Sequence, residues 1–356
     1  MRITGVEVRP EHLPLSRPYR IAGRTTDAVE AFLLVLRTDT GATGLGAASP
    51  EASITGETSE ACRVALEPAS LSWLEGGDVR RLGALCEKAR GRMASTPGAL
   101  AAVDMALHDL FARDLGVPLA SALGRVHEQF PTSVTIGIQE FREALGLAEE
   151  LVGAGFTILK IKTGESLDRD VELVARLSER FGSSVRLRCD ANVGYSAAEA
   201  VSFLERTAEL GVEFLEQPVP AGGDGLRGIP ERWRSAIAAD ESLLDEADAL
   251  ALAASPRACG VFNIKLMKCG GIRPALRIAA IADAARIDVM WGCMDESVIG
   301  IAAALHAALA APATRYLDLD GSFDLARDLA EGGFVLQDGA MSDNGQPGLG
   351  VRLAAD

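Results

Sequence analysis

The chain has 356 residues, 48% of them hydrophobic and 24% charged, so it can bury a sizeable core and is not generally disordered. Its 35 basic and 50 acidic side chains give a formal net charge of −15. This balance argues against nucleic acid or an anionic membrane as the main partner and favours a small-molecule ligand.

The N-terminal stretch "MRITGVEVRPEHLPLSRPYR" carries charges throughout and has no apolar core of a secretory signal. No apolar run is long enough to cross a bilayer, so we expect a cytoplasmic protein without membrane contact. The sequence leaves open whether it forms a homo-oligomer. Cysteines occur without C-x-x-C spacing, which indicates reduced thiols rather than a zinc site or disulfide scaffold: Cys62, Cys86, Cys189, Cys259, Cys269 and Cys293.

The first part of the chain predicts a small α+β domain over residues 1–125. Alternating apolar residues in 2–15 and 28–46 predict antiparallel strands with a turn at "RTDTGATG". Helical segments follow, including "PGALAAVDMALHDLFARDLG". After residue 320 no further strand–helix unit is visible, so residues 321–356 are expected to return to this first domain.

Residues 126–320 alternate short apolar runs with Ala/Leu/Glu/Arg-rich helical segments. Eight runs read as buried strands: "TSVTIGI", "FTILKIK", "SVRLRCD", "VEFLEQP", "SAIAADE", "GVFNIKL", "DVMWGCM" and "RYLDLDG". Eight strands separated by helices predict an α/β fold of the (β/α)8-barrel type.

Polar residues stand near the C-terminal end of every predicted barrel strand. They follow in this order: Thr135, Lys160 with Lys162, Asp190, Glu216, Asp240, Lys265, Cys293, and Asp318 with Asp320. Successive positions are roughly 25 residues apart, about the length of one strand–helix unit, so all reach the same rim. That rim is where barrel enzymes build their active sites.

Asp190, Glu216 and Asp240 fall on neighbouring strands and predict a metal site. Three converging carboxylates repel one another unless a cation lies between them, and an all-oxygen ligand set favours Mg²⁺. The alternative is that nearby arginines neutralise these acids, since Arg186 and Arg188 share a strand face with Asp190.

Lys162 and Lys265 would lie on opposite strands of an eight-membered ring. Two amines on opposite sides of one carbon could remove and return a proton, which serves racemisation or epimerisation. Lys160 lies about 6.5 Å from Lys162 along one strand face, and its repulsion would favour the neutral, basic form of Lys162.

These segments resemble the enolase superfamily, and within it the muconate lactonising subgroup. "KIK", "CDANVGYS", "EQP", "ADES" and "NIKLMKCGG" are similar to its K-x-K, three metal-ligand segments and sixth-strand lysine. The resemblance implies a Mg²⁺-dependent enzyme with an N-terminal capping domain on the barrel. Lys268, three residues past Lys265, falls in the opposite strand phase, so Lys265 is the predicted catalytic lysine.

Within this subgroup, "YLDLDG" resembles the D-x-D of dipeptide epimerases, which implies that Asp318 and Asp320 bind the α-ammonium of a dipeptide substrate. Arg24 resembles the arginine with which L-Ala-D/L-Glu epimerases bind the glutamyl carboxylate. Thr135 and Cys293 align with substrate-contact positions, and Lys160 would polarise the substrate carboxylate.

Other hypotheses remain open from the sequence. The same subgroup includes o-succinylbenzoate synthases, N-acylamino acid racemases and cycloisomerases. A metal-dependent peptide-binding protein and a barrel enzyme that forms a lysine Schiff base are further alternatives, although neither explains both the paired lysines and the three carboxylates.

Overall fold

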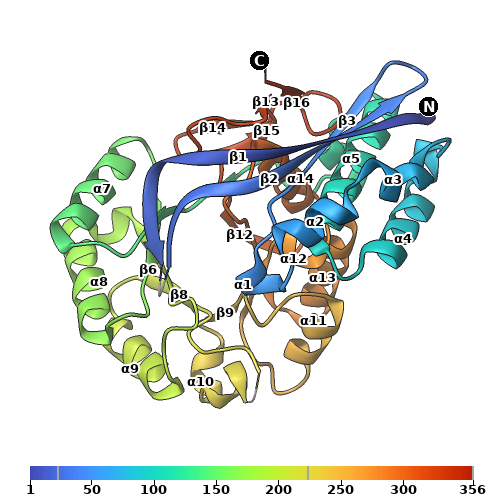
Figure 1. Ribbon diagram of the computed structural model, residues 1–356. Helices are drawn as coiled ribbons and strands as arrows, with labels where there is room; N and C mark the ends of the chain where they lie inside the picture. The colour runs from blue at the N-terminus through green and yellow to red at the C-terminus, as the bar shows by residue number, and fades with distance from the viewer. Residues whose placement is uncertain (22–23, 223, 355–356) are drawn as a thin grey trace.

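The computed structural model describes residues 1–21, 24–222 and 224–354 (Figure 1). The chain begins with the antiparallel strands β1 (Ile3–Ile21), β2 (Arg24–Thr38) and β3 (Thr43–Ala48). The predicted turn joins β2 to β3, and β1 pairs along most of β2. Helices follow: α1 (Ala52–Thr55), α2 (Ser59–Ala65), α3 (Pro68–Leu71), α4 (Leu82–Met93), α5 (Pro97–Leu115) and α6 (Leu119–Leu123).

The predicted barrel is confirmed. Its eight strands pair in parallel in chain order: β5 (Val134–Ile136), β6 (Ile158–Lys162), β7 (Arg186–Asp190), β8 (Val212–Glu216), β9 (Ile237–Ala239), β10 (Val261–Ile264), β11 (Asp288–Gly292) and β12 (Thr314–Asp318). The first and last strands meet through a parallel bridge between Thr132 and Leu317. We call this junction the seam; it has fewer backbone contacts than the other strand pairs.

Helices cover the outside of the barrel: α7 (Phe141–Gly153), α8 (Leu167–Phe181), α9 (Ala197–Thr207), α10 (Glu231–Arg234), α11 (Glu246–Ala253), α12 (Leu266–Cys269), α13 (Ile272–Ala285) and α14 (Val298–Ala310). Local signals account for their ends. Ser196 and Glu199 form a capping box at the start of α9. Helix α14 is apolar all round because it is buried on every side.

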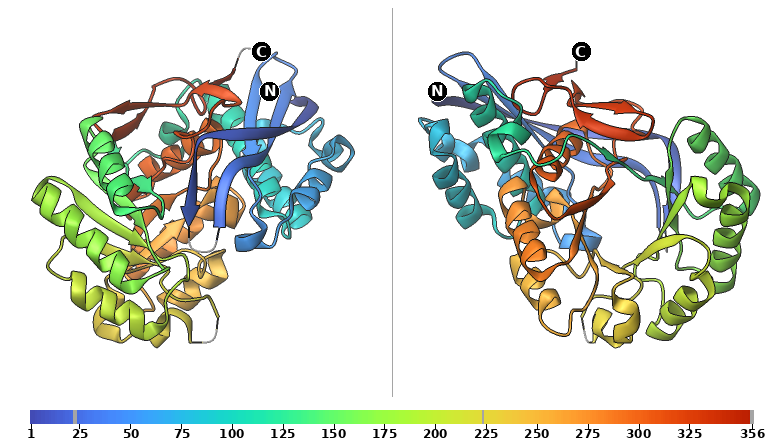
Figure 2. Two further views of the ribbon diagram at one scale, coloured as in Figure 1. Left: turned by 60° about the vertical axis from the view of Figure 1, so that its left-hand side comes forward. Right: turned by 180° about the vertical axis from the view of Figure 1, so that it is seen from behind.

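Short strands outside the barrel come from the C-terminal segment and, in the case of β4, from just before the barrel: β4 (Phe130–Pro131), β13 (Ala330–Gly332), β14 (Phe334–Gln337), β15 (Ala340–Asp343) and β16 (Val351–Leu353). They lie beside the N-terminal sheet at one end of the molecule (Figure 2). Contacts between Ser16 and Asp324 and between Leu119 and Gly348 join the N-terminal and C-terminal segments. The domain boundaries at residues 125 and 320 stay a prediction.

The β1–β2 hairpin extends from the N-terminal sheet toward the barrel (Figure 1). The backbone N–H of Ile138, beyond β5, donates to Arg20 O at 2.8 Å. Arg20 also forms an ion pair with Glu165, 2.6 Å away in the loop after β6. The hairpin is therefore held over the C-terminal ends of the barrel strands.

All six cysteines carry free thiols, as the spacing predicted. In the part of the chain described here, no helix combines the length and hydrophobicity that a bilayer crossing requires.

Asp109 of α5 joins three parts of the molecule. Its fully buried carboxylate accepts hydrogen bonds from Leu45 N (3.0 Å) in β3, Leu349 N (2.8 Å) near the C-terminus and Arg113 Nε (2.9 Å). Gly348 packs so closely that an added Cβ would lie 2.0 Å from Asp109 Oδ1. One carboxylate thus satisfies donors from both ends of the chain.

We predict that Asp109→Ala lowers the free energy of unfolding by about 3–5 kcal/mol, because it leaves a charge and two amides without their buried acceptor. Denaturant unfolding followed by circular dichroism would measure this loss. Glu331→Ala, which removes only an exposed ion pair with Arg352, is the control and should leave the transition midpoint almost unchanged. Equal midpoints for the two variants would contradict the assigned role of Asp109.

Candidate active site

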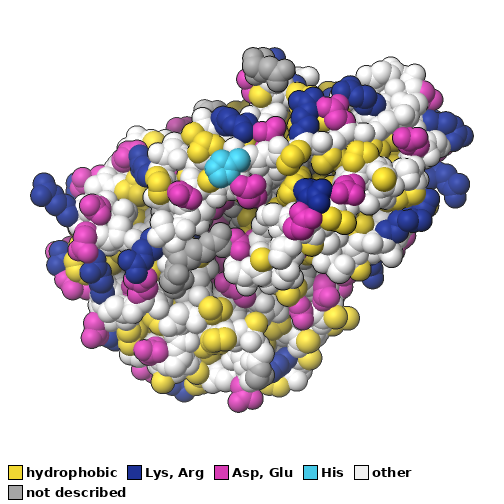
Figure 3. Space-filling view, in the orientation of Figure 1, with side chains coloured by type: hydrophobic (Ala, Val, Ile, Leu, Met, Phe, Trp, Pro, Cys, Tyr) yellow, Lys and Arg dark blue, Asp and Glu magenta, His cyan; other side chains and the backbone are white. Residues whose placement is uncertain are grey.

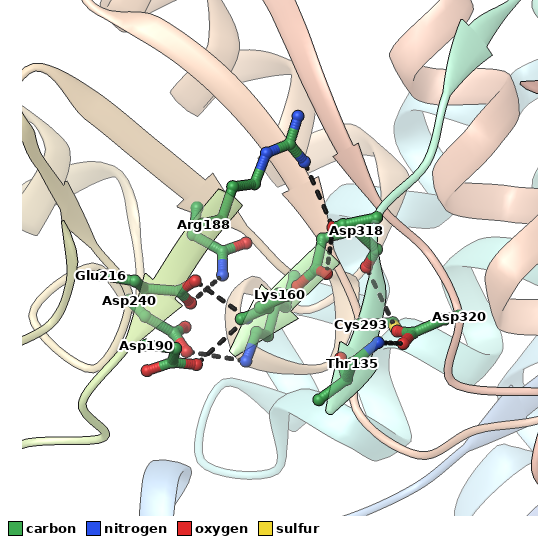
Figure 4. Close-up of polar contacts among 12 residues, drawn as sticks. Thr135, Lys160, Arg188, Asp190, Glu216, Asp240, Cys293, Asp318 and Asp320 are labelled. Carbon is green, nitrogen blue, oxygen red and sulfur yellow. Dashed lines mark hydrogen bonds and ion pairs between the residues drawn. The ribbon is translucent and has the colours of Figure 1, made fainter. Parts of the chain in front are cut away.

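Three carboxylates meet at the C-terminal ends of adjacent strands. Asp190 ends β7, Glu216 ends β8, and Asp240 follows β9 directly. The register pairs Asp190 with Glu216, and all three side chains are fully buried. Because parallel strands end at one rim, the chain converges these acids as the sequence predicted (Figure 4).

Lys160 lies at the centre of this acidic cluster. Its Nζ is 2.7 Å from Asp318 Oδ2, 2.8 Å from Glu216 Oε2 and 3.1 Å from Asp190 Oδ2 (Figure 4). Lys162 Nζ lies 2.8 Å from Asp190 Oδ2. The two lysines share one strand face as the alternation predicted, and each is also paired with carboxylates from neighbouring strands.

Asp240 binds two lysines from the sixth strand–helix connection. Lys265 Nζ is 2.7 Å from Oδ2, and Lys268 Nζ is 2.5 Å from Oδ1. Lys268 also donates to the backbone oxygens of Asp240 and Asn263. Sequence reasoning missed this contact because α12 begins directly after Lys265, so strand alternation no longer describes where the side chain of Lys268 lies.

The three carboxyl groups differ in pKa, because their lysine partners differ. Burial and then the neighbouring Asp190 raise the pKa of Glu216 to about 8. For Asp190 burial acts in the same direction, but the ion pairs with Lys162 and Lys160 outweigh it and lower the pKa to about 2. Lys265 and Lys268 likewise hold the pKa of Asp240 far below its usual range, against the effect of burial. A further cation would favour the ionised form of Glu216.

The donor set around these acids fits a hard divalent cation such as Mg²⁺. Glu216 Oε2, although close to Lys160, receives no hydrogen bond within the described residues, and neither do the buried Asn192 Oδ1 and Glu241 Oε2. Asn263 Nδ2 donates to the other oxygen of Glu216 at 2.6 Å and fixes its orientation. Buried oxygens with spare acceptor capacity beside three carboxylates are the ligands that Mg²⁺ prefers.

Lys162 and Lys265 belong to strands on opposite sides of the ring. Lys162 ends β6 and Lys265 follows β10, and three strands separate β6 from β10 in each direction around the closed barrel. Each lysine is bound to a different outer member of the acid trio, Asp190 or Asp240. The trio thus lies along the arc that connects the two amines.

The remaining predicted residues gather at the seam. Thr135 N donates to Asp320 Oδ2 at 2.7 Å, and Cys293 Sγ donates to Asp318 O at 3.2 Å (Figure 4). Asp318 is bound by Lys160, as described above. Burial and the adjacent charge of Asp318 raise the pKa of Asp320 to about 7.

Two other sequence-based expectations have structural outcomes. The alternative that arginines neutralise Asp190 is not supported, since Arg186 and Arg188 both pair with Glu213. Arg24 begins β2 beside the hairpin turn, but its side chain lies outside the described residues, so its role stays a prediction.

A cleft of about 1220 Å³ opens over this cluster, between the barrel mouth, the β1–β2 hairpin and residues 49–59. Lys160, Lys162 and Lys265 line its floor together with Thr135, Cys293, Asp318 and Asp320. The predicted substrate contacts whose side chains are described therefore all border one cavity that can hold a small molecule.

The fold and this site define the class of protein. Residues 3–124 match the mandelate racemase / muconate lactonizing enzyme N-terminal domain, and residues 143–356 match the enolase C-terminal domain-like family. The chain belongs to the enolase superfamily, as its motifs predicted.

Particular members are similar over nearly their whole length. An L-Lys-D/L-Arg epimerase of Methylococcus capsulatus is 55% identical over 352 residues, 99% of each chain. A crystal structure of the dipeptide epimerase from M. capsulatus, with Mg and L-Arg-D-Lys, superposes with a TM-score of 0.97 at 55% identity, covering 99% of each chain. An L-Ala-D/L-Glu epimerase of Clostridium acetobutylicum is 33% identical over 343 residues, 96% of each chain.

We predict that Mg²⁺ stabilises the protein through the acid trio. A free Mg²⁺ concentration 100-fold above the dissociation constant should add about 2.7 kcal/mol to the free energy of unfolding. Glu216→Gln keeps the side-chain shape but removes a charged ligand, and should weaken Mg²⁺ binding at least about tenfold. Calorimetric titration and thermal unfolding would measure both effects. Glu209→Gln, on the exposed surface, is the control, and an equal loss there would contradict the site.

Proposed function

We propose that this protein is a Mg²⁺-dependent dipeptide epimerase that inverts the α-carbon of the C-terminal residue. The observation that carries the proposal is the pair of lysines, Lys162 and Lys265, on opposite strands flanking three convergent carboxylates. A binding protein would have no use for two opposed bases, and a Schiff-base enzyme would need only one lysine and no carboxylate trio. The similarity to named dipeptide epimerases supports the same conclusion.

In this mechanism, one neutral lysine amine removes the α-proton and the opposite ammonium delivers a proton to the other face of the planar enolate. One C–H bond breaks and one forms, so the substrate changes configuration without gain or loss of atoms. Lys160 presents a fixed positive charge to the substrate carboxylate, because three acids hold its ammonium in place. Mg²⁺, held by Asp190, Glu216 and Asp240, would stabilise negative charge that develops on that carboxylate.

The seam residues would bind the other end of the dipeptide. Asp318 and Asp320 offer carboxylate oxygens to the α-ammonium, and Thr135 and Cys293 lie beside them. A substrate with a free amino terminus would therefore be preferred to an N-acylated one. This favours a dipeptide over the substrates of acylamino acid racemases and cycloisomerases, which lack that ammonium.

The cleft also supports a proposal for side-chain class. Beyond the catalytic cluster its walls include the acidic residues Glu241 and Asp324. Among the described side chains, the arginines that line it, Arg17 and Arg20, are each paired with a glutamate. Acidic side chains also lie beside the hairpin on the face seen in Figure 3. We infer a dipeptide with cationic side chains, like those named for the relatives at 50–55% identity. The alternative, an acidic side chain bound by Arg24, is tested by the same experiment.

We expect metal-dependent exchange of the α-hydrogen of the C-terminal residue when L-Arg-L-Lys is incubated with the protein in D₂O, detected by proton NMR. L-Ala-L-Glu should exchange at least about tenfold more slowly, because its acidic side chain would meet an acidic wall. Faster exchange of L-Ala-L-Glu would reverse the assignment of side-chain class. Absence of exchange with a full dipeptide panel would reject the epimerase proposal.

The two lysines should act on different epimers. Lys162→Ala and Lys265→Ala should each lose epimerisation but keep exchange with only one configuration of the C-terminal residue, and the favoured configuration should differ between the variants. The same L- and D-configured dipeptides measured with both variants provide the internal control. Exchange of both configurations by either variant would contradict the two-base mechanism.

Dipeptide binding should depend on pH through Asp320. Its raised pKa, about 7, means that a proton competes with the substrate ammonium below neutrality. Lowering the pH from 7 to 6 should weaken binding about fivefold, whereas raising it from 7 to 8 should strengthen it only about twofold. Calorimetry with the Lys265→Ala variant avoids turnover. Asp320→Asn in that background should bind weakly at both pH values, and an unchanged slope there would assign the proton elsewhere.

A further inference from the structure

A buried arginine crosses the inside of the barrel beneath the catalytic layer. Arg188 lies two residues before Asp190 on the same face of β7, and only 1% of its surface is exposed. Its guanidinium lies near the rings of Phe214 and Tyr316, with Cζ 5.5 and 4.9 Å from their centroids. Its Nε donates to Glu213 Oε2 at 2.8 Å. Burying a charged group costs free energy unless hydrogen bonds or ion pairs replace its contacts with water.

The other end of this guanidinium reaches the seam. Arg188 Nη1 donates to Leu317 O of β12 at 2.6 Å and to Ser133 Oγ, just before β5, at 3.2 Å. Ser133 N also donates to Leu317 O at 3.1 Å. Arg188 therefore connects β7 and β8 to the junction where the first and last strands close the barrel.

The direction of the hydrogen bonds is determined by chemistry. A guanidinium can only donate, so Ser133 Oγ accepts from Arg188 and has one proton left to give. Two acceptors lie within reach of that hydroxyl, Asp318 Oδ1 at 2.6 Å and Leu317 O at 3.2 Å, and the shorter distance assigns the proton to Asp318. Lys160 donates to the other oxygen, Oδ2, at 2.7 Å. Both oxygens of Asp318 are thus held as acceptors by groups from opposite sides.

We propose that Arg188 and Ser133 form a positioning relay that fixes the orientation of the ammonium-binding carboxylate of Asp318. This inference rests on the proposed function, in which Asp318 binds the dipeptide's amino terminus. Neither Arg188 nor Ser133 lines the cleft, so neither touches the substrate. They act through Asp318, whose carboxylate they hold in one orientation at the seam. Asp320, the other aspartate of the D-x-D segment, is held separately by the backbone N–H of Thr135.

Ser133→Ala tests the relay because it removes the hydroxyl but leaves the contacts of Arg188 with Glu213 and Leu317. We expect KM for L-Arg-L-Lys to rise about tenfold with little change in kcat, since a charged acceptor loses one of its oriented donors. Exchange of N-acetyl-L-Arg-L-Lys, which has no ammonium, should be unchanged. The preference for the free dipeptide over the acetylated one should therefore fall about tenfold. Ser133→Thr, which keeps a hydroxyl, should restore it.

Thr132→Ala is the matched control. Thr132 is equally buried at the seam, but its hydroxyl accepts from Leu319 N and donates to Ser133 O, not to Asp318. This variant should lower the melting temperature without changing the preference for a free ammonium. Loss of that preference to the same degree in Thr132→Ala and Ser133→Ala would overturn the relay and indicate general loosening of the seam.

Crystal structures of the two variants without dipeptide give a readout that does not depend on activity. Rotation of the Asp318 carboxylate in Ser133→Ala but not in Thr132→Ala supports the relay. An unmoved Asp318 in Ser133→Ala overturns it, whether or not the protein proves to be an epimerase. Absence of dipeptide exchange by the unmodified protein would instead reject the proposed function alone.

Discussion

The mutual neutralisation of buried carboxylates and lysines at one end of the barrel is the constraint on which the rest of the structure depends. Asp190, Glu216 and Asp240 are removed from water, and an ionised carboxylate in that environment is costly unless a cation is near. Lysines from β6 and from the connection after β10 supply that charge. The barrel is what brings them within 3 Å, since the acids and lysines come from separate strand–helix units.

This arrangement explains why the lysines occupy an otherwise apolar strand. Lys160 and Lys162 alternate with Ile158, Leu159 and Ile161, whose side chains are all fully buried. The apolar residues hold the strand between the barrel interior and the helices, and the lysines meet acids of the neighbouring strands at its end. Lys160 is enclosed and, in the proposed mechanism, would serve as a fixed charge. Lys162 is bound to a single carboxylate and lines the cleft, where it is available for proton transfer.

Much of this site could be predicted from the sequence because strand alternation and the repeat of strand–helix units are local patterns. They place Asp190, Glu216, Asp240 and Lys162 on one rim without knowledge of contacts. Lys268 was underestimated because a one-turn helix replaces the strand there and returns its side chain to Asp240. The pairing of Arg188 with Glu213 was also missed, because it depends on which acidic side chain of the neighbouring strand lies at the same level along the barrel axis as Arg188.

The seam could be predicted least, for a physical reason. Its contacts join residues about 185 positions apart, such as Ser133 with Asp318, and exist only once the ring has closed. No periodicity in the chain indicates that a serine just before the first strand will donate to an aspartate at the end of the last one. Motif similarity identified Asp318 and Asp320, but not what holds them.

In the proposed function, the closure of the barrel would also give the seam a role in substrate selection. Backbone pairing between the first and last strands is sparse, so the side chains of Arg188, Ser133 and Asp320 provide much of the connection there. Any group that orients Asp318 or Asp320 therefore also helps to close the barrel. An ammonium bound at this junction would meet carboxylates that barrel closure already holds in fixed orientations. This is a reason to place the recognition of the amino terminus at the seam and the proton transfer on the well-paired strands beside it.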